Sequence, residues 1–154
     1  MKNQSVQEQH APNSICFGCG PANPQGLRIR SFPQGDALVC DFTPDTHHHA
    51  FPGMVNGGIL GTLLDCHSNW TAAHHLMTTR KLDAPPCTVT AEFHVKLRRP
   101  TPMTMLHLSA RAVETDGDKV TVEASVEADG KVCATCRGVF VAVKEGHPAY
   151  HRWG

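Results

Sequence analysis

The sequence lacks a long apolar segment, an excess of charge of one sign and a paired set of cysteines. No apolar run approaches the roughly 20 residues that a membrane-spanning helix needs, and residues 1–12 contain no hydrophobic centre of a signal peptide. We therefore expect a cytoplasmic protein without membrane contact. The 14 lysines and arginines balance the 14 aspartates and glutamates, so the chain has no general attraction for nucleic acid.

The seven cysteines argue against the disulfide framework of a secreted domain, because their number is odd and their spacing irregular. Cys16 and Cys19 form a Cys-x-x-Cys pair. A structural zinc site needs four ligands, and Cys133 and Cys136, which have the same spacing, lie in a strand pattern that points them to opposite faces. We expect reduced thiols, no metal and no cofactor.

The chain is long enough for one domain, with 154 residues of which 40% are hydrophobic. Residues 1–24 are polar and rich in turn-forming residues, which predicts an N-terminal arm. The periodic pattern of residues 25–146 predicts the folded domain, and residues 147–154 are expected to form a C-terminal tail.

Hydrophobic periodicity predicts one long helix and six strands. Residues 55–78 contain no proline and repeat apolar side chains at helical spacing, so they predict a largely buried helix capped by Asn56. Turn signals separate the alternating segments, which predicts a largely antiparallel sheet packed on that helix, an α+β arrangement. The strands are expected at residues 26–30, 37–42, 88–98, 103–114, 120–126 and 132–143.

Strict alternation over residues 88–98 predicts which side chains share a face of that strand. Thr90 is expected on the polar face and Phe93 on the apolar face. A curved sheet around one helix leaves strand edges open, and pairing them across a two-fold axis removes that liability. We therefore expect a homodimer or a dimer of dimers.

Residues 54–65, which read M-V-N-G-G-I-L-G-T-L-L-D, resemble the motif of hotdog-fold acyl-coenzyme A thioesterases of the phenylacetate-pathway (PaaI-like) type. That motif is His-Gly-Gly followed by an acid eight residues after the first glycine, and Gly57 and Asp65 have this separation. Asn56 stands in place of the histidine; it can cap the helix but cannot become a cation or a general base.

The resemblance extends over most of the chain, from about Cys16 to Val143. Residues 90–100 are similar to the family's following strand, with Thr90 ten residues before the proline of an Arg-Pro pair. Residues 16–27 look like the N-terminal segment of one branch of these proteins. The resemblance implies a hotdog fold and hydrolysis of an acyl-coenzyme A thioester.

The helix motif also suggests how the chemistry is divided. The N–H of Gly57, helped by Gly58, is expected to bind the developing oxyanion, because a helix N-terminus offers unpaired N–H groups. Asp65 is the expected general base or nucleophile. Thr90, on the partner subunit's strand if the resemblance holds, is expected to orient water or to hold Asp65.

Further residues are expected around the substrate. His49, on the loop before the helix, is the candidate for orienting water or the substrate carbonyl, with Asn56 beside it. Met54 is expected to line the acyl pocket. Arg98 and Arg99 are the candidates for binding the phosphates of coenzyme A, since the guanidinium group suits phosphate.

Other interpretations remain open at this level. The two glycines can simply permit close packing, and Asp65 can be a structural carboxylate bonded to Thr62, His67 or Asn69. The loop that contains the three consecutive histidines 47–49 can be a solvated surface. The replacement at Asn56 leaves room for a non-catalytic acyl-coenzyme A binder. Residues 49–52 faintly resemble a hydratase or dehydratase element.

Overall fold

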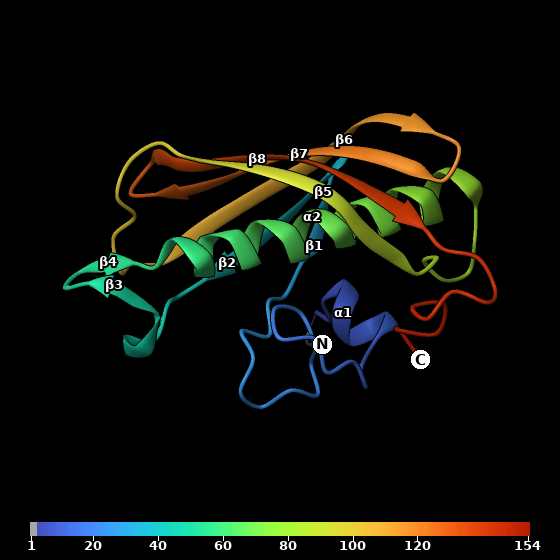
Figure 1. The fold of residues 1–154 in the computed structure, drawn as a ribbon, viewed down its shortest axis with the longest axis horizontal. Helices are drawn as coiled ribbons and strands as arrows, with labels where there is room; N and C mark the ends of the chain where they lie inside the picture. The colour runs from blue at the N-terminus through green and yellow to red at the C-terminus, as the bar shows by residue number, and fades with distance from the viewer. Residues whose placement is uncertain (1–2) are drawn as a thin grey trace.

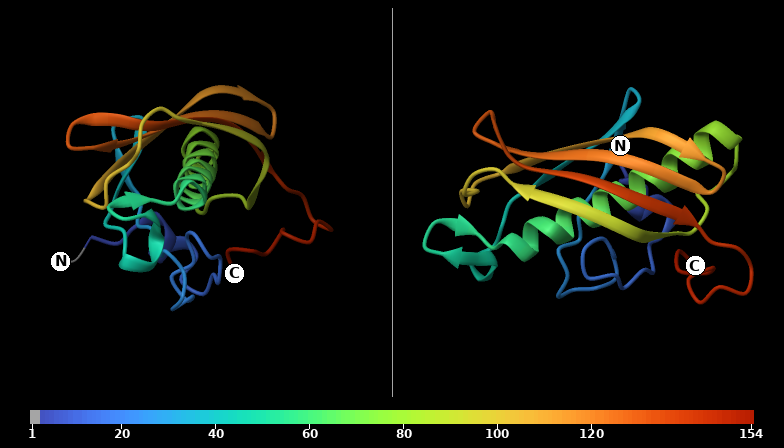
Figure 2. Two further views of the ribbon diagram at one scale, coloured as in Figure 1. Left: turned by 60° about the vertical axis from the view of Figure 1, so that its left-hand side comes forward. Right: turned by 45° about the horizontal axis from the view of Figure 1, so that its top comes forward.

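A computed structural model of the protein describes residues 3–154. A 24-residue helix, α2 (Gly57–Arg80), runs along one face of a six-stranded antiparallel sheet, and the sheet curves around it (Figures 1 and 2). The strand order is β1-β2-β6-β7-β8-β5, which leaves β1 and β5 at the two edges. The α+β hotdog architecture expected from the sequence is confirmed.

The strands follow the predicted segments closely from β5 onward. A separate two-stranded ribbon, β3 and β4, follows the short 3₁₀ helix η1 (Thr46–His48) and lies at the N-terminal end of α2 (Figure 1). The strands are β1 (Phe32–Gln34), β2 (Ala37–Phe42), β3 (His49–Phe51), β4 (Met54–Val55), β5 (Thr88–Leu97), β6 (Leu106–Asp116), β7 (Lys119–Ala128) and β8 (Lys131–Ala142).

The helix α2 begins and ends through local interactions that its sequence encodes. The Asn56 side chain accepts hydrogen bonds from the N–H groups of Gly58 and Ile59, so the predicted N-cap is confirmed. Lys81 ends the helix in the left-handed conformation. Between these ends the helix buries side chains around most of its circumference, including Leu63 and Leu64, which are fully buried.

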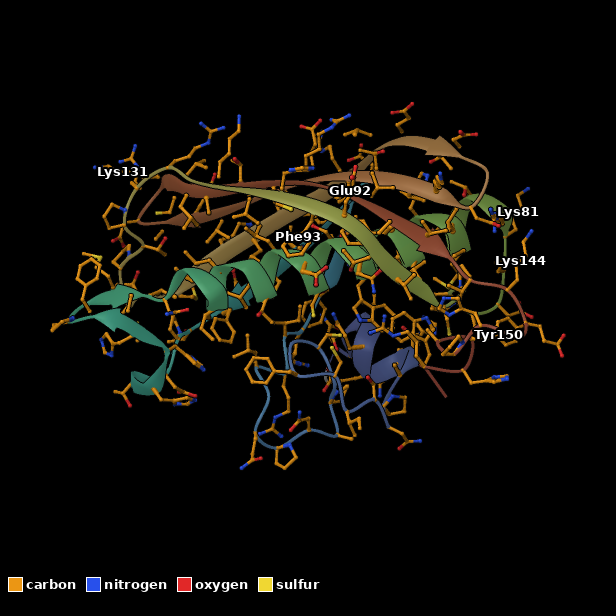
Figure 3. All side chains as sticks on the ribbon, in the orientation of Figure 1. Lys81, Glu92, Phe93, Lys131, Lys144 and Tyr150 are labelled. Atoms are coloured by element: carbon orange, nitrogen blue, oxygen red, sulfur yellow. The ribbon has the colours of Figure 1, made fainter. Side chains whose placement is uncertain are left out.

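A β-bulge in β5 changes the predicted assignment of faces. Thr90 pairs with Phe140 and Phe93 pairs with Gly138, two positions apart on β8, so Thr90 and Phe93 point to the same face. The extra residue is Ala91, between the paired positions. The prediction that Thr90 and Phe93 face opposite sides is therefore wrong. Figure 3 shows Phe93 between the sheet and α2.

The predicted first strand at residues 26–30 is displaced to β1, whose pairing with β2 forms the hairpin. Leu27 and Ile29 are buried, as the alternation suggested, but their N–H groups bond to the carbonyls of Phe17 and Gly18 instead of to a strand. Arg28 between them adopts a positive φ of 49°, which is incompatible with a strand.

The N-terminal segment packs on the side of α2 that faces away from the sheet (Figures 1 and 2). The helix α1 (Val6–His10) starts at a capping box formed by Ser5 and Glu8. Gln7 is fully buried and donates to Ser31 Oγ at 2.9 Å, and Ser31 Oγ lies 2.8 Å from His67 Nδ1 on α2. The predicted arm is thus joined to the domain by buried hydrogen bonds.

The C-terminal residues also pack against the domain. The indole ring of Trp153 stacks on that of Trp70 with ring centroids 4.2 Å apart, and its N–H donates to the carbonyl of Pro86. Arg152 donates to the carbonyl of Thr88. Within the described residues, no helix is both long and apolar enough to cross a membrane.

Candidate active site

The carboxylate of Asp65 lies midway along α2 and is held by a residue of β5. The Thr90 hydroxyl donates a hydrogen bond to Asp65 Oδ1 at 2.6 Å. The bulge in β5 makes this contact possible, because strict alternation would turn Thr90 away from the helix. Thr62, His67 and Asn69 each bond elsewhere, so the structural partners considered for Asp65 are not its partners. Asp65 and Thr90 form what we call the mid-helix group.

The environment of Asp65 favours its protonated form more than water does. Partial burial raises the pKa of the Asp65 carboxyl above its ordinary value, while the hydrogen bond from Thr90 acts in the opposite direction. The neighbouring Cys16 also raises this pKa, and Arg152 lowers it. A carboxylate with a raised pKa is a stronger base, which suits abstraction of a proton from water.

A second group of predicted residues lies at the N-terminus of α2. Asn56 Oδ1 accepts hydrogen bonds from the N–H groups of Gly58 and Ile59, at 2.8 and 3.3 Å. The Gly58 N–H is therefore not free for a substrate oxygen. Within the described residues 3–154, the Gly57 N–H donates no hydrogen bond. The Gly57 N–H, at the positive end of the helix dipole, is thus available to bind a developing negative charge.

The β3–β4 ribbon places His49 and Met54 beside this helix end. His49 pairs with Val55 in the ribbon, and the ring of His49 is anchored through Nδ1 to the carbonyl of Thr46 at 2.6 Å. This leaves its Nε2 for a further contact. Met54 is half-buried, and its backbone forms an isolated antiparallel β-bridge with Pro102. We refer to His49, Asn56 and Gly57 as the N-terminal group.

The two groups are separated along the helix. Eight residues at 1.5 Å per residue place Gly57 and Asp65 about 12 Å apart along the axis of α2. One carbonyl must lie about 3 Å from both the oxyanion donor and the activated water. Gly57 and Asp65 of a single chain therefore cannot act on the same thioester.

The contact between Thr90 and Asp65 forms within one chain. The expectation that Thr90 reaches Asp65 from a partner subunit is therefore corrected: the short separation of α2 and β5 in the fold already brings them together. Sequence reasoning missed the cysteines near Asp65. Cys16 of the N-terminal segment lies 3.8 Å, sulfur to sulfur, from Cys66, the residue that follows Asp65.

Of the two predicted phosphate-binding arginines, Arg98 lies on the outer face of the sheet. Arg98 and Arg137 border a groove of about 660 Å³ that crosses β5, β6, β7 and β8. Arg98 donates to Thr135 Oγ1, and Arg137 forms an ion pair with Glu123 at 2.7 Å. Asp65 and Gly57 do not line this groove. Arg99 is exposed, and its N–H bonds to the carbonyl of Cys133.

Comparison with solved structures identifies the family. A thioesterase superfamily protein from Shewanella loihica PV-4 is 31% identical, with 75% of this chain and 91% of that chain covered and a TM-score of 0.65. The phenylacetic acid degradation-related protein of Ralstonia eutropha JMP134 (21% identity, 75% and 86% covered, TM-score 0.64) shares the fold. So does the PaaI protein of the E. coli phenylacetic acid degradation operon (15% identity, 77% and 81% covered, TM-score 0.65).

Neither the sequence profiles of known families nor the curated proteins give a match. The identity and coverage of the Shewanella protein nevertheless show the relationship. The fold is the hotdog fold of these proteins, and the chain belongs to the thioesterase superfamily.

Proposed function

We propose that the protein hydrolyses acyl-coenzyme A thioesters to the free acid and coenzyme A. The observation that carries this proposal is the Asp65 carboxylate on α2, which accepts a hydrogen bond of 2.6 Å from the Thr90 hydroxyl. Membership of the thioesterase superfamily supports the reaction class.

In the proposed reaction, Asp65 removes a proton from a water molecule as the water oxygen bonds to the thioester carbonyl carbon. The carbonyl oxygen becomes an oxyanion and accepts a hydrogen bond from the Gly57 N–H of a second copy of the chain. The carbon–sulfur bond then breaks, and the leaving thiolate takes the proton from Asp65. The acid and the thiol are released and Asp65 returns to its carboxylate form.

Direct attack by Asp65 on the carbonyl is the competing route, with a mixed anhydride as the intermediate. Single turnover in water enriched in heavy oxygen separates the two. Heavy oxygen in the Asp65 carboxyl group after turnover indicates the nucleophilic route, because water then cleaves the anhydride. Heavy oxygen in the product acid alone shows that water attacks the acyl carbon, and the absence of an acyl-enzyme mass after rapid quenching then assigns the general-base route.

The working unit we propose is a two-fold dimer. The edge strand β5 carries two exposed apolar side chains, Phe93 (39% exposed) and Leu97 (57% exposed), on the face that turns toward α2. Pairing β5 with its copy covers the open edge. It also allows the N-terminal group of one copy to approach the mid-helix group of the other, which the 12 Å separation within one chain requires.

The primary test is thiol release from a panel of acyl-coenzyme A substrates, with Asp65→Asn beside the wild-type protein. We expect turnover by the wild type and a loss of at least about 100-fold in the variant. Asp41→Asn, at an exposed carboxylate on β2, is the matched control and should retain full activity. Equal turnover by wild type and Asp65→Asn would refute the catalytic role of Asp65, whereas equal rates at the uncatalysed background would favour a binding function.

Complementation tests whether the site is shared between copies. Asp65→Asn and Gly57→Pro are co-expressed with different affinity tags, and the mixed population is assayed. A shared site leaves one intact centre in each mixed dimer, so activity should return to about a quarter of the wild-type value. Absence of any recovery, in a sample that contains mixed dimers, would contradict the shared site.

A further inference from the structure

Three cysteine side chains from distant parts of the sequence meet between the N-terminal segment and α2. Cys16 and Cys19 come from the loop before β1, and Cys66 comes from the helix. Their sulfur atoms all lie within 4.8 Å of one another, and the thiols are free. The two-ligand motif seen in the sequence thus gains a third ligand in the fold.

The spacing of these sulfurs matches a shared metal ion better than a disulfide. Zinc–thiolate bonds are about 2.3 Å long, so two thiolates at the corners of a tetrahedron are about 3.8 Å apart. The Cys16 and Cys66 sulfurs are 3.8 Å apart. A disulfide would require about 2.0 Å.

The backbone around Cys16 and Cys19 is shaped to present both thiols to α2. The N–H of Gly20 bonds to the carbonyl of Cys16 at 2.8 Å, which closes a tight turn. Gly18 lies directly against α2, where an added Cβ would overlap the Cys66 sulfur. The loop can therefore approach the helix this closely only because residue 18 has no side chain.

A buried polar group beside the cluster lacks a partner. Trp70 follows Cys66 by one helical turn, is 1% exposed, and places its indole N–H beside the Cys19 thiol. Within residues 3–154 this N–H has no hydrogen-bond partner. A neutral thiol is a weak acceptor, whereas a metal-bound thiolate carries negative charge and accepts an N–H readily. Metal binding would satisfy the indole.

We propose that Cys16, Cys19 and Cys66 bind one zinc ion as thiolates, with the fourth tetrahedral position filled from solvent. Three thiolates select a thiophilic ion, and zinc accepts three protein ligands with one open position. Cys16 is partly exposed, which gives the solvent ligand its access. The ion would fasten the N-terminal segment to α2 at the residue next to Asp65.

The direct test is the metal content of the full-length protein. The reduced protein is incubated anaerobically with Zn²⁺, passed through a gel-filtration column and analysed for all first-row metals. We expect about one zinc per chain, and Co²⁺ in its place should give the absorption bands of a tetrahedral thiolate complex. Retention of no metal, or of another metal in preference to zinc, would overturn the assignment.

Variants locate the ion. Cys16→Ser and Cys66→Ser should each lose at least about 90% of the bound zinc, since a structural ion needs all of its thiolates. Cys87→Ser is the matched control, at a partly buried cysteine outside the cluster, and should keep its zinc. Zinc retained by Cys66→Ser would contradict the proposed ligand set.

Alkylation of the wild-type protein gives a readout that does not depend on the folding of a variant. Zinc should slow modification of Cys16 at least about tenfold and leave Cys87 unaffected, because a metal-bound thiolate is shielded. Mass spectrometry of the digested protein measures both sites. A disulfide among the three cysteines that persists under reducing conditions, with no metal uptake, would replace the metal proposal with a redox pair.

Discussion

The two faces of the six-stranded sheet are built by the same strands but have different chemistry. In β7, Val120 and Val122 are fully buried on the face that α2 covers. Glu123, the residue after Val122, is exposed on the outer face. The inner face holds the mid-helix group. The outer face carries a groove bordered by Lys96, Arg98 and Arg137.

Under the proposed function, this difference would separate catalysis on the inner face from phosphate binding on the outer face. A base benefits from partial burial, which raises the pKa of Asp65, and only the inner face provides that environment. Phosphate groups are strongly hydrated, so exposed arginine side chains are well suited to bind them. Changes on the inner face should therefore alter turnover or stability, and changes on the outer face should alter only substrate affinity.

The largest effect on turnover is expected from Gly57→Pro. Proline removes the N–H of residue 57, while the first position of a helix tolerates proline well. Asn56, at φ −62° and ψ 135°, already has the conformation that a following proline requires. We expect kcat to fall about 100- to 1000-fold. Gly57→Ala keeps the N–H and should stay within a few-fold of wild type; equal losses in both variants would indicate a steric effect instead.

The next effect concerns stability in acid. His67 is fully buried, donates from Nε2 to the carbonyl of Leu38 at 2.9 Å and accepts from Ser31 at Nδ1. Burial lowers the pKa of His67 from 6.5 to about 4. Below pH 6.5 the unfolded chain binds the proton first, so the free energy of unfolding should fall by up to about 1.4 kcal/mol per pH unit between pH 6.5 and 4.

Urea unfolding at a series of pH values measures this dependence. His67→Gln can keep both hydrogen bonds without titrating, so the slope in this window should become shallower. His94→Gln, at an exposed histidine bordering the outer groove, should leave the slope unchanged. An unchanged slope in His67→Gln would show that other groups control the acid sensitivity.

A smaller effect is expected from Thr90→Val, which removes the hydrogen bond to Asp65 without much change in volume. Loss of a hydrogen bond to a charged group costs about 1.5–3 kcal/mol, so kcat should fall by about tenfold or more. The pKa of Asp65 should rise, because Thr90 lowers it; the acidic limb of the pH–rate profile should then move to higher pH. Thr135→Val, on the outer face, is the control and should have neither effect.

The smallest effect is expected from Arg98→Ala. An exposed charge contributes little to affinity, so KM for an acyl-coenzyme A should rise by about threefold with kcat unchanged. The same acyl group on pantetheine, which lacks the nucleotide phosphates, should show no difference between wild type and variant. An equal rise in KM for both substrates would exclude phosphate recognition by Arg98.

The amino-acid sequence by itself determined the long helix α2 and the four strands that follow it. Helical periodicity and the capping ability of Asn56 define α2, and period-2 alternation with turn signals defines the four strands after it, because these features depend on neighbours a few residues apart. The separation of Gly57 and Asp65 was likewise visible, since it is fixed by helix geometry.

Only the tertiary structure decided how these residues combine. The bulge at Ala91 turns Thr90 toward a carboxylate 25 residues away, and the packing of the N-terminal loop brings Cys16 to Cys66 across 50 residues. Both contacts depend on the pairing of β5 with β8 and on the close approach of Gly18 to α2. Such contacts arise from packing between distant segments, and local periodicity carries no record of them.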